Sequence, residues 1–275
     1  MSLVTPPNES LQPTLDAADL DRRFSGLERL YGVAQARAIR NAHIAVVGIG
    51  GVGSWVAEAL ARSGVGHLTL IDMDHVAESN INRQVHALST TMGKAKVIAM
   101  QERIALINPA CVVHCVDAFV EPDNWPAILP DGVDATVDAC DQIKAKTAMA
   151  DWARRTRALF ISVGAAGGKR CAHKIDIADL SETTHDPLLA QMRYRLRKSH
   201  NAPRDGKRIG LTCVFSREAV RQADASCEVQ GDNTLNCHGY GSAVSVTATF
   251  GMCAAGWILD KISGATQSDD QKIAI

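Results

Sequence analysis

Short apolar runs alternate with longer amphipathic stretches through the middle of the chain. The apolar runs have the length and the β-branched content of buried strands, and they cover residues 43–48, 68–72, 112–117, 135–139 and 159–163. The stretches between them repeat apolar residues at helical spacing, and they cover residues 54–63, 93–108 and 142–157. Strands that alternate with helices predict an α/β fold with a doubly wound, Rossmann-like, mostly parallel sheet.

The start of the chain differs from this pattern. Residues 1–20 are polar and carry prolines, which predicts a disordered lead-in. Apolar residues over 21–41 recur at roughly helical spacing and predict two short helices. We therefore expect a Rossmann-like core over residues 21–170, and we expect residues 171–275 to complete the same domain.

The C-terminal part changes rhythm again. Residues 170–176 predict a strand that runs antiparallel to the others, and residues 211–216 predict a short strand. The insertion 181–208 between them is polar and basic, and residues 221–238 are predicted to form a loop. The apolar segment 242–259 predicts a final helix of small residues.

This final segment raises the question of a membrane. Residues 239–259 contain no charged side chain and are just long enough to span a bilayer. Their content of Ala, Gly, Ser and Thr is typical of a helix that packs closely against other elements, so we favour burial against the sheet over peripheral attachment to a membrane. Because the first 20 residues lack an apolar secretory run, we expect a cytoplasmic protein.

Composition narrows the possible partners. Twenty-nine Lys and Arg against thirty Asp and Glu give a net charge of −1, so binding to a nucleic acid would need a local basic patch. The eight cysteines form no Cys-x-x-Cys pair, which predicts free thiols in a reducing compartment and no structural zinc site.

The first predicted strand of the core leads into a glycine loop, Gly48-Ile49-Gly50-Gly51-Val52-Gly53. Such a loop opens a helix, so its backbone N–H groups can bind phosphate. Asp72 ends the next predicted strand, 19 residues after Gly53, where a carboxylate can accept the hydroxyls of a ribose. These features predict that the core over 21–170 binds an adenine nucleotide, which includes both NAD and ATP.

Charged residues further along the chain distinguish the two nucleotides. Arg83 and Lys96 come from consecutive elements at the carboxyl edge of the predicted sheet, where they can converge on phosphate oxygens. Asp141 follows a strand, where it can bind Mg²⁺ or cap the next helix. Each is an ordinary surface charge when taken alone, but together they favour a triphosphate. An NAD-dependent dehydrogenase remains an alternative that gives these three residues no role.

Five separately placed motifs carry a resemblance to a known family. They are Gly48-x-Gly50-Gly51-x-Gly53, Asp72-x-Asp74, Asn80-x-x-Arg83-Gln84, Lys96 and Asp138-x-x-Asp141. In this combination the chain resembles the ubiquitin-activating enzyme superfamily, which includes bacterial adenylyltransferases of thiamine and molybdopterin synthesis. The resemblance implies a ThiF-like adenylation fold with an antiparallel C-terminal extension. It also implies ATP and Mg²⁺ as cofactors, no zinc, and leaves a monovalent cation open as a further requirement.

The resemblance assigns roles to the matched positions. The glycines bind phosphate, Asp72 binds the ribose, and Asp141 binds Mg²⁺ or the reacting group, while Gln142 departs from the Asn of several relatives. The expected catalytic residues are Arg83, Lys96 and Asp141. The expected ATP-binding set is larger and comprises Gly48, Gly50, Gly51, Gly53, Asp72, Asp74, Asn80, Arg83, Gln84, Lys96, Asp138 and Asp141.

Within the superfamily, the chain is most similar to the family of tRNA threonylcarbamoyladenosine dehydratases. The similarity extends from Arg23 to about Leu259 and includes RFSGLERLYG at 23–32, VGAAGGK at 163–169 and DPLLAQMRYRLRK at 186–198. Members of this family use ATP to activate the carboxylate of threonylcarbamoyladenosine, beside the anticodon of tRNA, and dehydrate it to a cyclic form. The resemblance implies tRNA as the partner and a homodimer as the assembly.

The basic insertion fits an RNA partner. Seven cations lie between residues 193 and 208 with only Asp205 opposing them: Arg193, Arg195, Arg197, Lys198, Arg204, Lys207 and Arg208. A local patch of this kind is what phosphate binding requires on a chain of nearly zero net charge. The alternative is a solvated helix face without a partner. The second hypothesis for function, an adenylyltransferase that activates the C-terminus of a ubiquitin-like sulfur carrier, accounts less well for this patch and for the missing zinc cysteines.

Two cysteines and two arginines are candidates for further roles that the superfamily implies. Cys213 and Cys237 lie in the C-terminal half, where members that pass on a thioester or persulfide place their cysteine. They are candidate sulfur acceptors in a relay with a cysteine desulfurase, and a non-enzymatic relay scaffold is a further hypothesis, although a free Cys is more often a small buried hydrophobe. Several members also use an arginine from the partner subunit at the position of Gly26, which leaves Arg23 and Arg29 as candidates.

Overall fold

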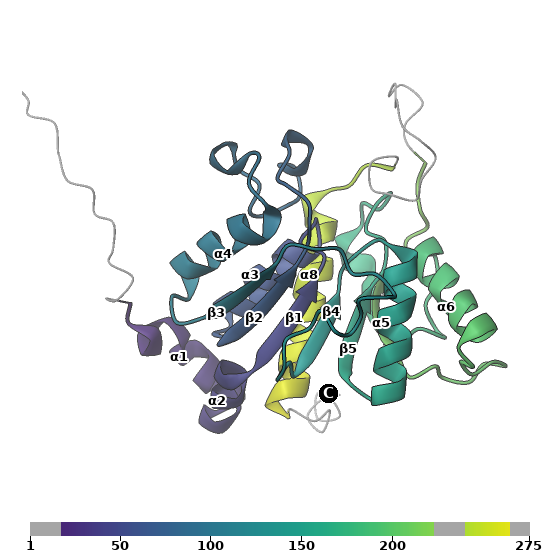
Figure 1. Cartoon of the computed structure of the whole chain (residues 1–275), viewed down its shortest axis with the longest axis horizontal. Helices are drawn as coiled ribbons and strands as arrows, with labels where there is room; N and C mark the ends of the chain where they lie inside the picture. The colour runs from purple at the N-terminus through teal and green to yellow at the C-terminus, as the bar shows by residue number, and fades with distance from the viewer. Residues whose placement is uncertain (1–17, 223–239, 265–275) are drawn as a thin grey trace, which may run out of the picture.

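The computed structural model of the chain describes residues 18–222 and 240–264 (Figure 1). The strands in the described residues are β1 (His43–Val47), β2 (His67–Ile71), β3 (Val112–Val116), β4 (Ala135–Asp138), β5 (Leu159–Val163), β6 (Ile175–Asp179) and β7 (Thr212–Ser216). They form one sheet in the order β3-β2-β1-β4-β5-β7-β6. Every neighbouring pair is parallel except β6 and β7, which are antiparallel. The predicted doubly wound, mostly parallel sheet with an antiparallel extension is confirmed.

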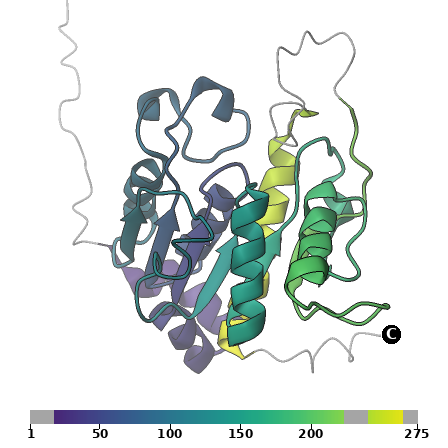
Figure 2. The ribbon, with the colours of Figure 1, turned by 45° about the vertical axis from the view of Figure 1, so that its right-hand side comes forward.

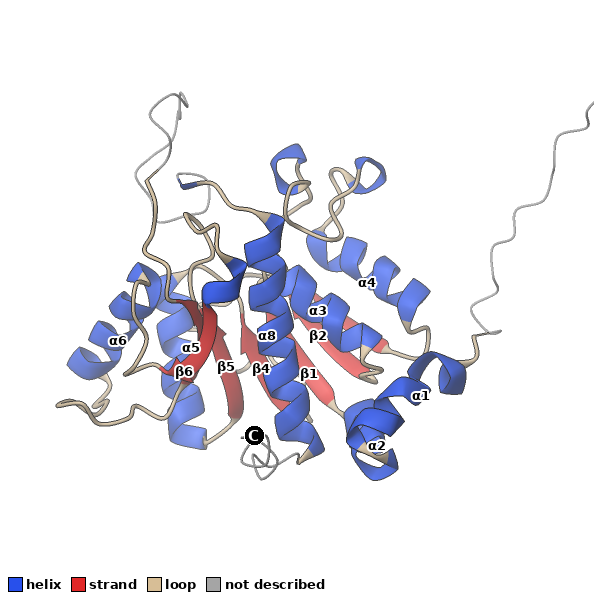
Figure 3. Cartoon of the chain, turned by 180° about the vertical axis from the view of Figure 1, so that it is seen from behind, coloured by secondary structure: helices blue, strands red, loops and turns tan. Residues whose placement is uncertain are grey.

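Helices cover both faces of this sheet. The α-helices are α1 (Leu20–Tyr31), α2 (Val33–Asn41), α3 (Gly53–Arg62), α4 (Lys96–Ile107), α5 (Ile143–Thr156), α6 (Pro187–Ser199) and α8 (Val244–Ser263). Figure 2 shows α5 and α6 side by side on one face. Figure 3, from behind, shows α3, α4 and α8 on the other face. Three short 3₁₀ turns complete the described elements: η2 (Glu78–Asn80), η3 (Ser89–Thr91) and η4 (Ala172–Lys174).

The final helix α8 packs closely against α3. A side chain at Gly251 would place its Cβ 2.7 Å from Cβ of Trp55 and 2.8 Å from the carbonyl oxygen of Val52. Phe250, Ala254 and Ile258 of α8 are buried in the same core as the strands. The small residues of this helix therefore allow a close approach to α3. Among the described residues, none of the helices has the length and apolar content needed to cross a bilayer.

The face of the sheet that carries α5 is also covered by α6. The sequence predicted only a polar, basic insertion for this region. Asp186 accepts a hydrogen bond from the N–H of Leu189 and begins α6, and Pro187 occupies its first turn. Leu189, Met192 and Leu196 of α6 are buried against the second core. The insertion 181–208 thus contains an amphipathic helix with one apolar stripe.

The predicted position of the antiparallel strand was wrong by five residues. It was placed at 170–176, whereas β6 begins at Ile175. The carboxylate of Glu218 accepts hydrogen bonds from the N–H groups of Arg170 and Cys171, and the chain then forms η4 before the strand begins. Most of the predicted lead-in, 1–20, and of the predicted loop, 221–238, lies outside the described residues.

Candidate active site

The glycine loop joins β1 to α3, and its glycines differ in what surrounds them. A Cβ at Gly53 would lie 1.7 Å from the carbonyl oxygen of Gly48, and one at Gly48 would lie 2.8 Å from the backbone nitrogen of Cys140, at a φ of +84°. By contrast, a Cβ at Gly50 would meet nothing within 4 Å, and one at Gly51 would first meet Arg83 and Thr247 at 3.4 Å. Gly48 and Gly53 therefore build the turn, while Gly50 and Gly51 leave space for a ligand.

Asp72, at the carboxyl end of β2, fixes this loop. Its Oδ2 accepts a hydrogen bond from the N–H of Ile49 at 2.6 Å, and its Oδ1 accepts one from the N–H of Asp74 at 2.8 Å. Burial raises the pKa of Asp72, and the nearby charge of Lys96 opposes this effect. The carboxylate that was predicted to bind the ribose thus lies beside the glycine loop and also positions it.

Two cations approach the loop from the segment between β2 and α4. Lys96 is the first residue of α4, and its Nζ lies 2.7 Å from Oδ2 of Asp74. The lysine side chain is 8% exposed, whereas that of Asp74 is 53% exposed. Arg83 follows η2 and donates from Nη1 to the carbonyl of Ser79 and to Oδ1 of Asn82. Both side chains are therefore fixed by contacts with residues of the same segment.

These groups line a cavity of about 520 Å³ at the carboxyl edge of the sheet. The predicted ATP-binding residues that line it are Gly48, Gly50, Gly51, Asp72, Asp74, Asn80, Arg83, Gln84, Lys96 and Asp141. The side chain of Gln84 supplies a buried Oε1 that has no hydrogen-bond partner in the described part of the chain. An unpaired buried acceptor and the open space at Gly50 both fit a site that is built around a polar ligand.

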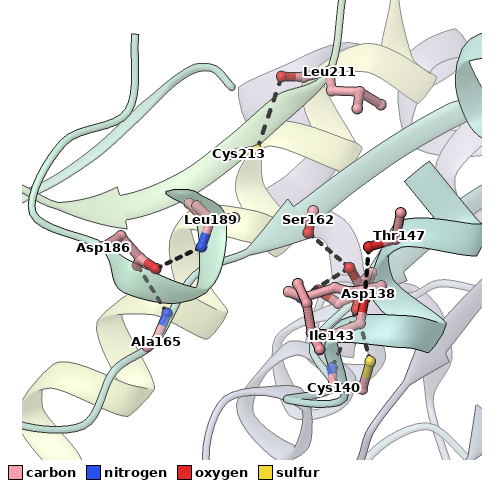
Figure 4. A network of polar contacts seen from close by, with 11 residues as sticks. Asp138, Cys140, Ile143, Thr147, Ser162, Ala165, Asp186, Leu189, Leu211 and Cys213 are labelled. Atoms are coloured by element: carbon pink, nitrogen blue, oxygen red, sulfur yellow. Dashed lines mark hydrogen bonds and ion pairs between the residues drawn. The ribbon is translucent and has the colours of Figure 1, made fainter. Parts of the chain in front are cut away.

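Two predicted positions, Gly53 and Asp138, do not line the cavity. Asp138, at the end of β4, is fully buried and accepts hydrogen bonds from Nζ of Lys146 at 2.8 Å and from Oγ of Ser162 at 2.7 Å (Figure 4 labels Asp138 and Ser162). Burial alone would lower the pKa of Lys146, but the adjacent Asp138 carboxylate has the larger opposite effect, so the pKa is raised overall. The two side chains form a charged pair that supports the turn leading to Asp141.

The opposite wall of the cavity comes from residues that carried no predicted role. It is formed by Phe119 and Val120 after β3, residues 164–167 after β5, Pro187 and Leu188 of α6, Tyr240 before α8 and Thr247 within α8. The stretch VGAAGGK at 163–169 supported the resemblance, so the glycines of 164–167 were a usable signal. Phe119 gave none, because it stands alone in a loop.

Buried charges hold this wall in place. Oδ2 of Asp186 accepts a hydrogen bond from the N–H of Ala165 at 2.9 Å, and Oδ1 caps α6 through Leu189 (Figure 4). Nζ of Lys169 donates to the carbonyls of His185 at 3.0 Å and Glu218 at 2.8 Å. Burial raises the pKa of Asp186 and lowers that of Lys169. The residues after β5 are therefore tied to α6 and to the end of β7.

Cys213, one of the two candidate sulfur acceptors, does not line the cavity. Cys213 lies in β7 with no exposed surface, and burial raises the pKa of its thiol. Cys237 lies outside the described residues. Cys140 does line the cavity, but its thiol contacts Oδ1 of Asp138 at 3.2 Å, and burial again raises its pKa. The described cysteines of this region are held as thiols, which gives a sulfur relay no support.

The structure divides the predicted RNA-binding cations into two groups. Nη1 of Arg193 donates to the carbonyls of Leu180 and Thr183, and Nε of Arg197 donates to that of Pro203. The remaining members reach the surface to varying degrees: Arg195 is half-buried, and Lys198, Arg204, Lys207 and Arg208 are exposed. We call these five residues the α6 patch.

The α6 patch lies away from the cavity. Pro187 lines the cavity at the start of α6, and Lys198 lies 11 residues later, about 16 Å along the helix axis. Nζ of Lys198 stands 5.6 Å from the ring centre of Tyr194, which is 61% exposed. An exposed aromatic ring among cations is a surface suited to RNA.

The two candidate arginines of the N-terminal region also differ. Nη1 of Arg23 donates to the carbonyl of Ile107 at 2.7 Å, at the end of α4, so it is used within its own chain. Arg29 is exposed on α1.

Comparisons with known proteins match this chain over most of its length. The ThiF family model matches residues 22–274. The tRNA threonylcarbamoyladenosine dehydratase of Haemophilus influenzae is 45% identical over 246 residues, which cover 88% of this chain and 94% of that protein. The protein of the same name from Escherichia coli is 43% identical over 250 residues, which cover 88% and 93% of the two chains.

Solved structures give the same result for the fold. E. coli TcdA in complex with AMP has a TM-score of 0.82 and 42% identity, and the match covers 90% of this chain and 97% of that chain. TcdA in complex with ATP has a TM-score of 0.81 and 40% identity, with 94% and 99% covered. The fold described above is therefore that of a protein solved with these nucleotides.

Proposed function

This chain belongs to the ThiF family, and from this premise we propose that it is an ATP-dependent dehydratase that cyclises threonylcarbamoyladenosine in tRNA. The observation that carries the proposal is the meeting of Arg83, Lys96 and Asp141 around one cavity beside the open glycines. Relatives that share more than 40% identity over nearly their full length bear the name of this activity. An NAD-dependent dehydrogenase would leave the three charged side chains without a role.

The residues of the cavity fit ATP. Gly50 and Gly51 offer backbone N–H groups and space for the phosphates, and Asp72 offers a carboxylate for the ribose hydroxyls. Arg83 and Lys96 would supply the positive charge that a triphosphate requires, and the Lys96 ammonium that pairs with Asp74 would be available to a phosphate oxygen. Asp141 is exposed at the cavity and is the carboxylate that we assign to Mg²⁺.

The chemistry asks the protein for positioning and charge. ATP would supply a phosphorus group to the carboxylate oxygen of the substrate, which makes that oxygen a good leaving group. An atom of the same threonylcarbamoyl substituent attacks the activated carbon and loses its proton, and the phosphorylated oxygen leaves as the ring closes within the substrate. Arg83 and Lys96 stabilise the negative charge on the phosphates during these steps, and the cavity walls exclude water. No bond to the protein is needed, which agrees with the burial of the Cys213 thiol.

The tRNA needs a surface beyond the cavity, and we assign that role to the α6 patch. Arg193 and Arg197 are excluded from it because they are half-buried and also donate to backbone carbonyls, whereas Arg204, which donates to the carbonyl of Arg197, is exposed. Replacing Arg195, Lys198 and Lys207 by Gln should weaken tRNA binding and flatten its dependence on salt, while ATP binding stays unchanged. Unchanged tRNA affinity would remove this patch from the proposal.

We propose a homodimer as the assembly. Leu30, Val33 and Leu106 are exposed by 75%, 63% and 72%, on α1, α2 and α4. Apolar side chains of this size at the surface are suited to an interface between two chains. Light scattering on the purified protein should give twice the chain mass, and a monomeric mass would contradict the assembly.

The decisive experiment is a mass measurement on the substrate. The purified protein is incubated with ATP, Mg²⁺ and tRNA that carries threonylcarbamoyladenosine, and the nucleoside is analysed by mass spectrometry. We expect loss of one water per modified nucleoside, dependent on ATP. No loss of water, together with ATP-dependent adenylation of a sulfur-carrier C-terminus, would replace this proposal with the adenylyltransferase.

A further inference from the structure

A second group of exposed cations borders the cavity on the side of β6. It consists of Arg170, Lys174, Arg217 and Arg221, and we call it the rim cluster. The side chains of Arg217 and Arg221 are 62% and 58% exposed, and Arg170 and Lys174 are also classed as exposed. The amino-acid sequence does not reveal this group, because its members come from two segments that are about 40 residues apart.

The topology of the sheet brings the two segments together. Because β6 is antiparallel to its neighbour, its start lies at the carboxyl edge of the other strands, where Ile175 pairs with Ser216. The N–H of Arg217 donates to the carbonyl of Lys174 at 2.9 Å, and that of Arg221 donates to the carbonyl of Gly168 at 2.9 Å. The rim cluster is therefore one continuous surface.

This surface adjoins the mouth of the cavity. Gly167 and Val220 line the cavity, and each lies within three residues of a rim cation in the chain. A Cβ at Gly168 would meet the side chain of Val220 at 2.8 Å, so the two segments are in direct contact there. The segments that carry the rim cluster therefore continue directly from the wall of the cavity.

The charge of the rim cluster is only partly neutralised. Arg217 pairs with Asp176, and Arg221 pairs with Glu218 at 3.2 Å. Within the described residues, the side chains of Arg170 and Lys174 form neither a hydrogen bond nor an ion pair. Each guanidinium has five N–H donors, so the paired arginines also keep donors for a ligand.

The substrate itself requires phosphate contacts at this mouth. In the proposed function the reacting nucleoside remains part of the tRNA strand, so when its base substituent enters the cavity, the phosphates on either side lie at the entrance. We propose that the rim cluster binds these flanking phosphates and so positions the anticodon loop, an inference that rests on the proposed function. The α6 patch then contacts more distant phosphates.

The two surfaces lie at opposite ends of one edge strand. β6 runs from Ile175, which follows Lys174 of the rim cluster, to Asp179, whose carboxylate accepts hydrogen bonds from the N–H groups of Ile209 and Gly210 near the α6 patch. Five residues of extended chain span about 16 Å. An RNA strand of several nucleotides can bridge that length, which gives the edge of the sheet a continuous path for the backbone.

The test uses Arg170 and Lys174, the two rim cations whose side chains have no partner in the part of the chain that the structure describes. In the variant R170Q/K174Q we expect the Kd for tRNA to rise about tenfold. The slope of log Kd against log salt should fall by about 1.4, which corresponds to two lost phosphate contacts on a single strand. The Kd for ATP should stay within about twofold, and the KM for tRNA should rise while kcat at saturating tRNA is kept.

The matched control is R22Q/R37Q, which removes the same charge from exposed positions on α1 and α2. It should change the Kd for tRNA less than about twofold. If R170Q/K174Q binds tRNA like wild type, or if the control loses as much affinity, the rim cluster is overturned while the dehydratase stands. If wild type removes no water from modified tRNA, the proposed function itself fails.

Discussion

The strands β1 to β3 and the strands β5 to β7 surround the same cavity but use charged side chains in different ways. Around β1 to β3, Arg83 and Lys96 come from loops and helix starts and line the cavity. Around β5 to β7, Lys169 and Asp179 are buried and bind backbone groups of their own chain. The two cations of the first half are thus placed for a ligand, whereas the two buried charges of the second half hold irregular chain in place.

Asp179 illustrates the second use. Its carboxylate accepts hydrogen bonds from the N–H groups of Ser181, Ile209, Gly210 and Leu211. These groups have no strand partner, and buried N–H groups without an acceptor are costly. One carboxylate therefore ties the two ends of the insertion between β6 and β7 together.

The largest effect is expected at the buried ion pair of Asp138 and Lys146, which lies between the two groups of strands and also uses charge inside the protein. Asp138→Asn leaves the Lys146 charge without its partner, so the free energy of unfolding should fall by about 3–5 kcal/mol in a denaturant titration. The double variant Asp138→Leu with Lys146→Met removes both charges, so its free energy of unfolding should fall by less than that of Asp138→Asn. If Asp138→Asn were more stable than the double variant, the charged pair would be contradicted.

Lys96 tests the first use of charge. Lys96→Met should lower the ATP-dependent rate of dehydration by about 100-fold, because one cation at the transferring phosphate is lost. The fold should remain, as judged by circular dichroism. Lys94→Met is the matched control, because Lys94 lies two residues before Lys96 and pairs with the exposed Glu102. This variant should change the rate less than about twofold.

The glycine loop contains a structural position and a ligand-binding position within six residues. Gly53→Ala places a Cβ against the carbonyl of Gly48 and should lower the free energy of unfolding by about 1–3 kcal/mol. Gly50→Ala places a Cβ in open space, so stability should be kept while the Kd for ATP rises about tenfold. Calorimetric unfolding and ATP titration of both variants measure the contrast, and equal loss of stability would refute it.

The smallest effect is a pH dependence at Glu218. Burial alone would raise its pKa, but hydrogen bonds from Cys171, Arg170 and Arg221 have the larger opposite effect and lower the pKa from its ordinary 4.5 to about 2. Between these values the unfolded chain binds more protons, so the stability that Glu218 contributes is present above pH 4.5 and is lost as pH falls toward 2. The denaturation midpoints of wild type and Glu218→Gln should therefore converge with acid. A constant difference down to pH 2 would exclude this contribution.

The sequence predicted the first half better than the second for a physical reason. The glycine loop, Asp72 and Lys96 are local signals, because each lies next to the strand or helix that positions it. The start of β6 depends on Glu218, more than 40 residues away, which captures the N–H groups of Arg170 and Cys171. No local pattern contains that contact.

Charge patterns also do not reveal where a cation points. Arg193 and Arg197 stood among the predicted RNA-binding residues, yet both donate to carbonyls of their own chain. The rim cluster showed the reverse, since Arg170 and Arg217 are far apart in sequence and meet only through the antiparallel pairing of β6. Topology decides both cases.

The position of β7 between β5 and β6 has a consequence for synthesis of the protein. β6 is made before β7 but pairs with no other strand in the described sheet, so it stays without a neighbour until residues 212–216 emerge. Thr247, which lines the cavity, comes later still, on the helix that covers α3. An incomplete chain thus carries the glycine loop but not a finished site, and a ribosome must reach α8 before the protein can consume ATP productively.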